Sequence, residues 1–186
     1  MTLNVHAFLP RSQANGPGVR AVVWVQGCSL RCPGCFNPET HSHAPRELVA
    51  VTALAERLLA DVAHLEGVSI SGGEPLEQAE ALLALLRRLR AGSSLSVLLF
   101  SGHTLAEIEA HPLGPAILAC TDVLVAGRYD PGQHLGHGLR GSANQRVHLL
   151  SDRYRPEEVD DTPVAEVILG TDGSITASGI AAFPVG

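Results

Sequence analysis

"AVVWVQGCSLRCPGCFN", residues 21–37, joins a nearly uninterrupted apolar run to a loop that carries three of the four cysteines of the chain. Residues 21–27 are almost fully apolar and rich in β-branched side chains, which is typical of a strand buried in a parallel sheet. The cysteines follow directly, at the expected carboxyl end of that strand. Ligands of α/β proteins bind at such ends, because loops vary there while the sheet holds them in place. The stretch therefore predicts an α/β fold and the edge of the sheet at which its chemistry takes place.

The rest of the chain alternates between short strand-like and longer helix-like segments separated by turn residues. This alternation indicates a mostly parallel sheet with right-handed crossovers. The expected strands are residues 67–75, 94–102 and 122–127, and the expected helices are residues 45–65, 76–92 and 103–111.

Three further segments depart from this alternation. Residues 3–9 alternate in polarity and predict a strand at the edge of the sheet. Residues 128–146 are rich in glycine and predict a long, irregular functional loop. Residues 164–179 alternate around "TDGS" and predict a C-terminal β-hairpin.

The composition excludes several classes of function. The 186 residues carry 13 arginines, no lysine and 19 acidic residues, for a net charge of −6. The arginines form no dense cluster and only 4% of residues are aromatic, so we expect no nucleic-acid partner. The apolar runs are much shorter than the roughly 20 residues of a membrane span, and the N-terminus lacks the pattern of a secretion signal. We therefore expect a cytoplasmic protein without a membrane partner.

The cysteine spacing favours metal chemistry over a disulfide framework. Cys28, Cys32 and Cys35 follow a C-x3-C-x2-C pattern, in a chain expected to reside in a reducing compartment. One interpretation is a zinc site that takes His41 or His43 as a fourth ligand. The favoured interpretation is a 4Fe-4S cluster held by three thiolates, which leaves one iron open for a substrate or cofactor.

Two other loops are expected at the same edge of the sheet. "SGGEP" (71–75) is the glycine turn that ends the expected strand segment at 67–75, and "SGHT" (101–104) begins at the end of the segment at 94–102. Because the carboxyl ends of parallel strands share one edge, we expect both loops to meet the cysteines there.

The cysteine pattern followed by "SGGEP" resembles the radical S-adenosylmethionine (SAM) superfamily. The order of further segments is similar to that of anaerobic ribonucleotide reductase activating enzymes, which are activases of glycyl-radical enzymes. The resemblance covers about residues 3–150 and rests on "NGPGVRAVVWVQGC" (15–28), "CPGCFNPET" (32–40), "GVSISGGEPL" (67–76), "LLFSGHTLAEI" (98–108), "DVLVAGRYD" (122–130) and "LRGSANQRVHLL" (139–150).

The resemblance implies a fold, an activity and a partner. It implies a partial (β/α) barrel of the radical SAM type over residues 1–150, with residues 151–186 as an extension packed on this core. The implied activity is that of a radical SAM oxidoreductase, in which the cluster reductively cleaves SAM to a 5′-deoxyadenosyl radical. The implied partner is a glycyl-radical enzyme, with anaerobic ribonucleotide reductase favoured, and the implied electron donor is reduced flavodoxin or ferredoxin.

The resemblance also assigns site residues. It makes Cys28, Cys32 and Cys35 the cluster ligands and places the adenine and methionine portions of SAM against two glycine-containing loops. Glu74 is expected either to accept from the SAM ammonium group or to brace its loop, with a solvated helix-terminal acid as the alternative. The implied SAM-binding residues are Gly34, Cys35, Phe36, Gly72, Gly73, Glu74 and Ser101.

Other polar residues admit plainer interpretations. Ser101 and His103 are possible ribose neighbours, although a hydroxyl group beside a helix start is more often a cap. The polar side chains of "RGSANQR" (140–146) face either a partner or the end of the sheet. His134 and His137 are expected in a solvated loop, Cys120 in the core, and three arginines, Arg87, Arg88 and Arg90, on the solvated face of a helix.

Three hypotheses of function follow. The first is an activase that abstracts hydrogen from a glycine of a large partner enzyme. The second keeps the cluster and SAM cleavage but acts on a small molecule or a peptide. The third is a non-catalytic metal-binding module, which would not cleave SAM.

Overall fold

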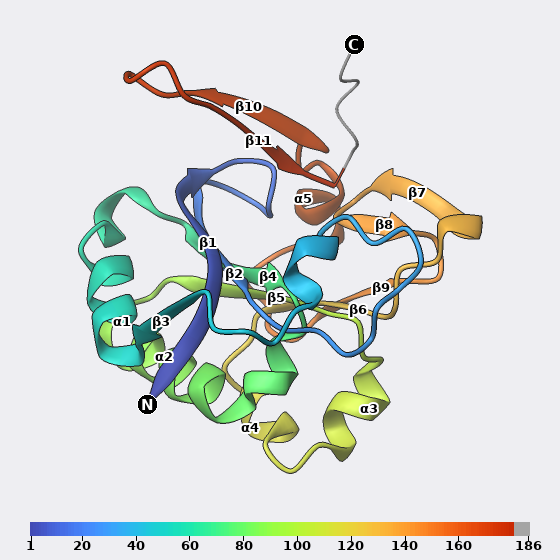
Figure 1. The fold of residues 1–186 in the computed structure, drawn as a ribbon, viewed down its shortest axis with the longest axis horizontal. Coiled ribbons are helices and arrows are strands. Elements are labelled where there is room, and N and C mark those ends of the chain that lie inside the picture. The colour runs from blue at the N-terminus through green and yellow to red at the C-terminus, as the bar shows by residue number, and fades with distance from the viewer. Residues whose placement is uncertain (181–186) are drawn as a thin grey trace.

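The computed structural model describes residues 1–180 and is built on one seven-stranded sheet (Figure 1). The strand order is β3-β1-β2-β4-β5-β6-β9. Within it β2, β4, β5 and β6 run parallel, while β1, β3 and β9 add antiparallel ladders at the two sides. The strands are β1 (Thr2–Ser12), β2 (Arg20–Val25), β3 (Glu47–Ala50), β4 (Gly67–Gly72), β5 (Ser96–Ser101), β6 (Val123–Ala126) and β9 (Arg146–Leu149).

The remaining elements are short helices and two small antiparallel sheets. The helices are α1 (Val51–Leu59), α2 (Ala79–Gly92), α3 (Leu105–Ala110), α4 (Gly114–Leu118) and α5 (Pro156–Asp160). The 3₁₀ turns are η1 (Pro38–His41), η2 (Val62–His64), η3 (Pro75–Gln78) and η4 (Pro131–Gln133). The small sheets are β7 (His134–His137) with β8 (Arg140–Ser142) and β10 (Ala165–Leu169) with β11 (Ile175–Gly179).

The α/β class, the parallel centre and the C-terminal hairpin are confirmed. Within residues 1–180, β3 and β9 end the large sheet and do not pair with each other, so the sheet is open. In that described part, no helix has the length and apolar character needed to cross a membrane.

Apolar alternation along the parallel strands divides the core into two clusters. Val23, Ile70 and Leu99 point to one face, where they pack with α1, α2 and α4. Leu98 and Val125 point to the other face, where they pack with the segment around α5. Successive side chains of a strand face opposite sides, so each strand contributes to both layers. The second face is left free of long helices near the carboxyl ends of the strands.

The expected edge strand and the first expected helix both needed correction. β1 lies inside the sheet, because residues 47–50 leave the helical pattern and pair with Thr2–Val5 as the edge strand β3. Leu48, expected on the buried face of a helix, is 59% exposed on this edge strand. The helix begins only at Val51. Strand pairing with a distant segment therefore overrides the local helical spacing.

The expectation of an irregular segment at residues 128–146 was wrong. That segment contains η4 and the two strands β7 and β8, which pair antiparallel. Gly136 and Gly138 have φ values of +59° and +56°, a backbone conformation that glycine adopts without steric cost. Gly138 thus forms the turn between β7 and β8 together with Leu139, and Gly136 lies within β7, where the ladder is irregular.

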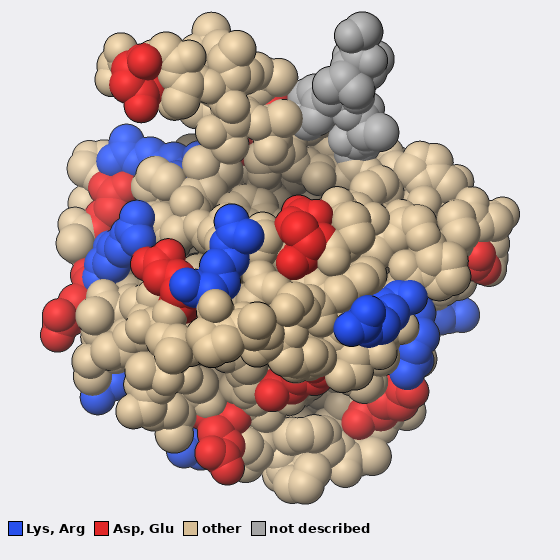
Figure 2. All heavy atoms as spheres, viewed as in Figure 1, with Lys and Arg blue, Asp and Glu red and all other residues tan. Residues whose placement is uncertain are grey.

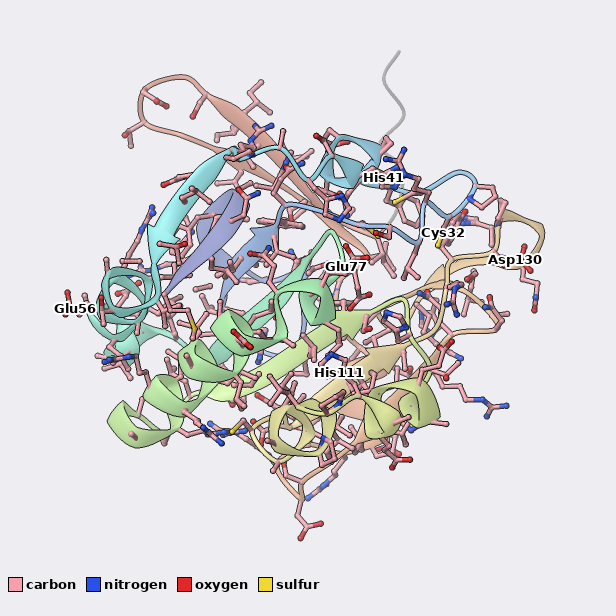
Figure 3. All side chains as sticks on the ribbon, turned by 60° about the horizontal axis from the view of Figure 1, so that its bottom comes forward. Cys32, His41, Glu56, Glu77, His111 and Asp130 are labelled. Atoms are coloured by element: carbon pink, nitrogen blue, oxygen red, sulfur yellow. The ribbon has the colours of Figure 1, made fainter. Side chains whose placement is uncertain are left out.

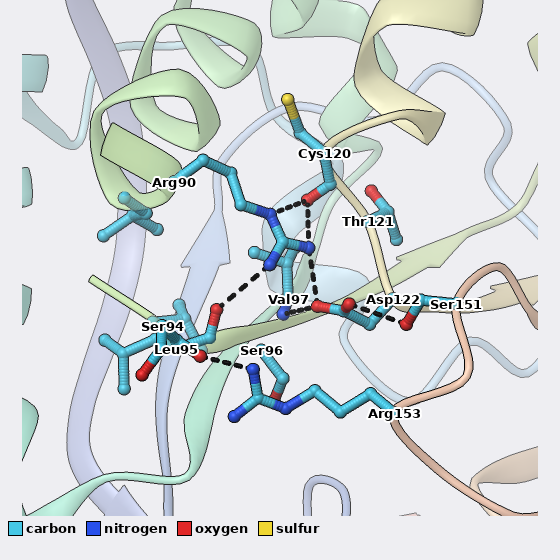
Figure 4. Close-up of polar contacts among 12 residues, drawn as sticks. Arg90, Ser94, Leu95, Ser96, Val97, Cys120, Thr121, Asp122, Ser151 and Arg153 are labelled. Carbon is cyan, nitrogen blue, oxygen red and sulfur yellow. Dashed lines mark hydrogen bonds and ion pairs between the residues drawn. The ribbon is translucent and has the colours of Figure 1, made fainter. Parts of the chain in front are cut away.

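Two arginine networks hold the end of the sheet opposite to the cysteines. Arg87 and Arg88 are exposed as expected, but Arg90 is half-buried and is not on a solvated face. Its guanidinium lies 2.6 Å from Asp122 Oδ2 and donates to the Cys120 carbonyl (Figure 4). Cys120 is partly buried against the core, in agreement with its expected role.

Arg20, at the start of β2, has no exposed surface. Its guanidinium donates to Ser69 Oγ at 2.8 Å, to Ser96 Oγ at 2.8 Å and to the Tyr154 hydroxyl at 3.2 Å. The Tyr154 hydroxyl donates in turn to Glu66 at 2.8 Å. A buried guanidinium whose three nitrogens all donate hydrogen bonds ties the segment after residue 150 to β2, β4 and β5.

Candidate metal and cofactor site

The three cysteines lie on a loop without regular secondary structure between β2 and η1. The loop turns tightly at Arg31 and Gly34, which have φ values of +46° and +67°. The Cys35 amide donates to the Cys32 carbonyl at 3.2 Å, so the second and third cysteines are held in one turn. All the thiols are free and none is fully exposed. Burial raises the pKa of Cys28 and of Cys35.

The glycine loop after β4 packs directly against the start of the cysteine loop. The Gly73 amide donates to the Val25 carbonyl and the Glu74 amide donates to the Gly27 carbonyl, both at 2.8 Å. A Cβ atom at Gly73 would lie 2.2 Å from the Gly27 carbonyl oxygen. Any larger residue would push the two loops apart, so glycine is required here for backbone packing in addition to any ligand contact.

Glu74 braces two of the loops and is not a solvated acid. The residue is 1% exposed, and its Oε1 accepts from the Leu76 amide at 3.0 Å and from Ser101 Oγ at 2.9 Å. Its Oε2 accepts from the Gly102 amide at 2.8 Å. Burial raises the pKa of this carboxyl group, while the hydrogen bonds favour its ionised form. The brace fixes the distance between the loop after β4 and the loop after β5.

Ser101 has its hydroxyl group engaged within the protein. Ser101 Oγ donates to Glu74 and accepts from the His103 amide at 3.1 Å. The helix cap itself is Thr104, whose side chain and Glu107 form a capping box at the start of α3. Ser101 therefore serves the loop brace, and His103 lies beside Glu107, with 3.8 Å between Nδ1 and Oε2.

One pocket joins all three loops at the carboxyl ends of the parallel strands. The expected convergence of these loops is therefore observed. The labelled Cys32 and Asp130 lie at one end of the molecule, far from Glu56 (Figure 3). The predicted residues that line the pocket are Cys28, Cys32, Cys35, Phe36, Gly72, Gly73, Glu74 and Ser101. Gly34, also predicted, lies on the same loop, where a Cβ atom would be 3.5 Å from Tyr129.

Tyr129 is a pocket residue that the sequence reasoning did not identify. Its ring lies 4.9 Å from that of Phe36, and its hydroxyl group is 3.2 Å from His134 Nδ1. His134 is exposed, as expected, and its ring also contacts those of Phe36 and Tyr129. The only sequence signal was an isolated aromatic residue directly after the strand β6, in "AGRYD". These rings connect the cysteine loop to the small sheet β7–β8.

The polar side chains of residues 140–146 bind mainly to the surrounding backbone. Gln145 accepts from the amides of Gly141 and Ser142 and donates to the Gly127 carbonyl. Ser142 is fully buried and accepts from the Asp130 amide, while Asn144 donates to the Arg128 carbonyl. Most of this segment therefore forms the polar turn that was one of its two interpretations.

The C-terminal hairpin forms another part of the pocket that was not foreseen. Gly179 and Ile180 line it together with Asn15. Asn15 and Ser178 are each 7% exposed, and the side-chain amide of Asn15 donates through Nδ2 to Ser178 Oγ at 2.6 Å. Because 163 positions separate these partners, sequence spacing offered no signal for this contact.

The donor types fit an iron–sulfur cluster better than a zinc site. His43 is committed to Glu77, with 2.6 Å between Nε2 and Oε2, and His41 Nε2 is buried without a hydrogen-bond partner. Among residues 1–180, no three His, Cys, Asp or Glu side chains are already arranged around a metal position. The three free thiols nevertheless line one pocket on a loop without regular secondary structure, and three thiolates are the donors that a 4Fe-4S cluster with one open iron requires.

Comparison with known proteins places these features in context. The model of a family described as a 4Fe-4S single cluster domain matches residues 14–148. The anaerobic ribonucleoside-triphosphate reductase-activating protein of Vibrio cholerae is 34% identical over 161 residues, covering 80% of this chain and 99% of the relative. Proteins of the same name from Escherichia coli K12 and Pasteurella multocida are 31% and 28% identical, with coverage of 80% and 99% in both cases.

Proposed function

Since the chain belongs to the family of anaerobic ribonucleoside-triphosphate reductase-activating proteins, we propose that it is a radical SAM activase. Its partner is a glycyl-radical enzyme, anaerobic ribonucleotide reductase being the favoured one, on which it generates the glycyl radical. A cytoplasmic setting and reduced flavodoxin or ferredoxin as the electron donor belong to the same proposal.

One observation carries the proposal. Three free cysteines, a glycine loop and a buried glutamate meet in a single pocket, in a chain that aligns with almost the full length of several activases. A purely structural metal site is closed by its protein ligands and needs no such pocket beside the metal. The arrangement supports a cluster that works on a bound small cofactor.

Cys28, Cys32 and Cys35 hold the 4Fe-4S cluster in this proposal. When bound, the cluster and SAM together supply reductive cleavage of SAM to methionine and a 5′-deoxyadenosyl radical, which takes a hydrogen atom from glycine. The protein binds, orients and shields these groups. A glycine is a suitable target because no side chain blocks the approach to its Cα atom.

The remaining predicted residues divide into contacts and positioning groups. Gly34 and Phe36 border the adenine of SAM, and Gly72 and Gly73 border its methionine portion through the backbone. Glu74 and Ser101 act on SAM indirectly, because their side-chain oxygens already hold the Leu76 and Gly102 amides and one another. These side chains keep the two loops at the spacing that SAM requires.

The deciding experiment is an anaerobic assay for 5′-deoxyadenosine. The full chain is reconstituted with iron and sulfide, reduced with dithionite and incubated with SAM, and the nucleoside is measured by chromatography. We expect brown cluster absorbance and 5′-deoxyadenosine, both with and without the partner enzyme. Zinc as the copurifying metal after anaerobic preparation, or a loaded cluster without SAM cleavage, would favour a non-catalytic metal-binding module and overturn the proposal.

The choice of substrate is tested separately with purified anaerobic ribonucleotide reductase. Electron paramagnetic resonance detects a glycyl radical directly. SAM cleavage without any glycyl radical on this enzyme would favour the alternative of a small-molecule or peptide substrate.

A further inference from the structure

The C-terminal hairpin presents an apolar face to solvent. In the register of β10 and β11, Leu169 pairs with Ile175 and Val167 pairs with Ala177. Paired residues share one face of a two-stranded sheet, so these four apolar side chains stand together. Leu169, Ile175 and Val167 are 74%, 72% and 54% exposed. We call these four residues the apolar hairpin face.

The opposite side of the hairpin carries Glu166, Ile168, Thr176 and Ser178 and is attached to the body of the protein. Glu166 and Ser178 form the adjacent cross-strand pair. Glu166 accepts from Ser12 Oγ and from the Gln13 amide, and Ser178 accepts from Asn15. This anchoring leaves the apolar hairpin face directed outward. Figure 1 shows the hairpin projecting from the body of the protein.

The hairpin surface visible in Figure 2 is uncharged apart from an acidic group at its far end. Soluble proteins seldom expose contiguous apolar side chains without a partner that covers them. Aliphatic side chains on an anchored hairpin favour binding to a protein partner, because little conformational entropy of the hairpin is lost when the complex forms.

The apolar hairpin face is continuous with the pocket. β11 runs from Ile175 to Gly179, and Gly179 and Ile180 line the pocket that contains the three cysteines. A protein that inserts a glycine into this pocket would therefore lie close to the end of the same strand. The hairpin lies beyond residues 14–148, the part of the chain that the family model matches.

We propose that the apolar hairpin face is the docking surface for the glycyl-radical partner and aligns the glycine-bearing segment of that partner with the pocket. The proposal rests on the function proposed above. The occupant is a protein with an apolar surface patch beside its glycine loop, and the rigid hairpin sets which partner the pocket accepts.

The test compares matched glutamate substitutions on the two faces of one hairpin. Leu169→Glu and Ile175→Glu place a charge on the apolar hairpin face, whereas Thr176→Glu places it at an exposed position on the opposite face. The full-length, cluster-loaded chain is assayed with anaerobic ribonucleotide reductase from the same organism. Affinity is measured by biolayer interferometry, the glycyl radical by electron paramagnetic resonance, and SAM cleavage without partner by 5′-deoxyadenosine release.

We expect Leu169→Glu and Ile175→Glu to weaken partner binding about tenfold or more, as the loss of an interface hot spot does. Thr176→Glu is expected to bind within about twofold of the unchanged chain, and all three variants are expected to keep partner-free SAM cleavage. A combined Leu169→Ser and Ile175→Ser variant removes apolar surface without adding charge. Weaker partner binding by this variant as well would show that the effect of the glutamates is not caused by a charge-induced distortion of the hairpin.

Equal partner affinity in the Leu169→Glu and Thr176→Glu variants would overturn the inference, as would failure of the unchanged chain to bind the reductase. Light scattering tests whether a second copy of this chain is the occupant instead. A dimer that Leu169→Glu dissociates, with no change in affinity for the reductase, would also overturn the inference. Absence of 5′-deoxyadenosine from the unchanged chain would instead refute the proposed function, while the binding comparison would still report on the surface.

Discussion

The two ends of the parallel strands are held together by different chemistry. At the end opposite to the cysteines, long charged side chains such as Arg20 and Arg90 cross between strands and bind distant carbonyl, hydroxyl and carboxylate groups. At the pocket end, glycines bring backbone close to backbone, and side-chain hydrogen bonds of Glu74 and Glu77 connect the loops. Long side chains therefore fill the space between strands at the charged end, while the pocket end keeps its interior free for a cofactor.

Removal of one cluster ligand should give the largest effect. We expect Cys32→Ala to reduce both the iron–sulfur absorbance and SAM cleavage to background, because two thiolates do not hold a 4Fe-4S cluster with an open iron. Anaerobic absorbance spectra and 5′-deoxyadenosine release measure the two losses. Cys120→Ala is the matched control, since Cys120 lies in the other half of the fold, and it should retain both. Full activity of the Cys32 variant would remove our assignment of the ligands.

Arg20→Met probes the charged end without touching the pocket. The buried acceptors around Arg20 would lose their donor, and we expect the free energy of unfolding to fall by about 3 kcal/mol or more. Urea denaturation followed by circular dichroism measures this change. Arg87→Met, on the exposed face of α2, should change it by at most about 0.5 kcal/mol. Similar values for the two variants would show that the buried network contributes little.

Glu74→Gln probes the pocket end. An amide group can accept at only one of its two heavy atoms, so either the Gly102 amide or the Leu76 and Ser101 donors lose their acceptor. We expect a loss of about 1–3 kcal/mol in stability, together with a higher KM for SAM at a less affected kcat. Urea denaturation measures the loss of stability, and the dependence of 5′-deoxyadenosine release on SAM concentration measures KM and kcat. A lower kcat at unchanged KM would contradict a positioning role.

Asp122→Asn should give the smallest effect and one that depends on pH. Burial alone would raise the pKa of Asp122, but hydrogen bonds from Val97, Ser151 and Arg90 outweigh it and lower the pKa below its ordinary value. A carboxyl group with a lowered pKa in the folded state stabilises the protein above its unfolded value of about 4, and this stabilisation is lost as the pH falls through the folded value.

The loss in Asp122→Asn is therefore expected to be about 1–2 kcal/mol at pH 7 and to shrink below about pH 4. Urea denaturation at a series of pH values measures it, with the exposed Asp152→Asn as the control. A difference that remains constant down to pH 3 would exclude the ionised form as the source of the effect.

The sequence predicted those parts of the molecule that depend on local pattern and parallel topology. The parallel strands β2, β4, β5 and β6 and the meeting of the cysteine, glycine and Ser101 loops follow from apolar periodicity and from the shared carboxyl edge of such strands. The β3 strand was missed because its conformation is decided by pairing with Thr2–Val5, although Leu48 and its neighbours have helical spacing. Tyr129, Ile180 and the engagement of Arg90 depend on tertiary contacts that no local pattern encodes.

The contact between Asn15 and Ser178 also bears on how the chain folds. Contacts between residues so distant in sequence form only after the intervening chain is ordered, because closing a long loop carries an entropic cost before any contact compensates it. The pocket wall formed by Gly179 and Ile180 is therefore expected to close late in folding. Until then the cysteine loop stays open on that side, which gives a newly made chain an interval in which the cluster can be delivered before the wall is complete.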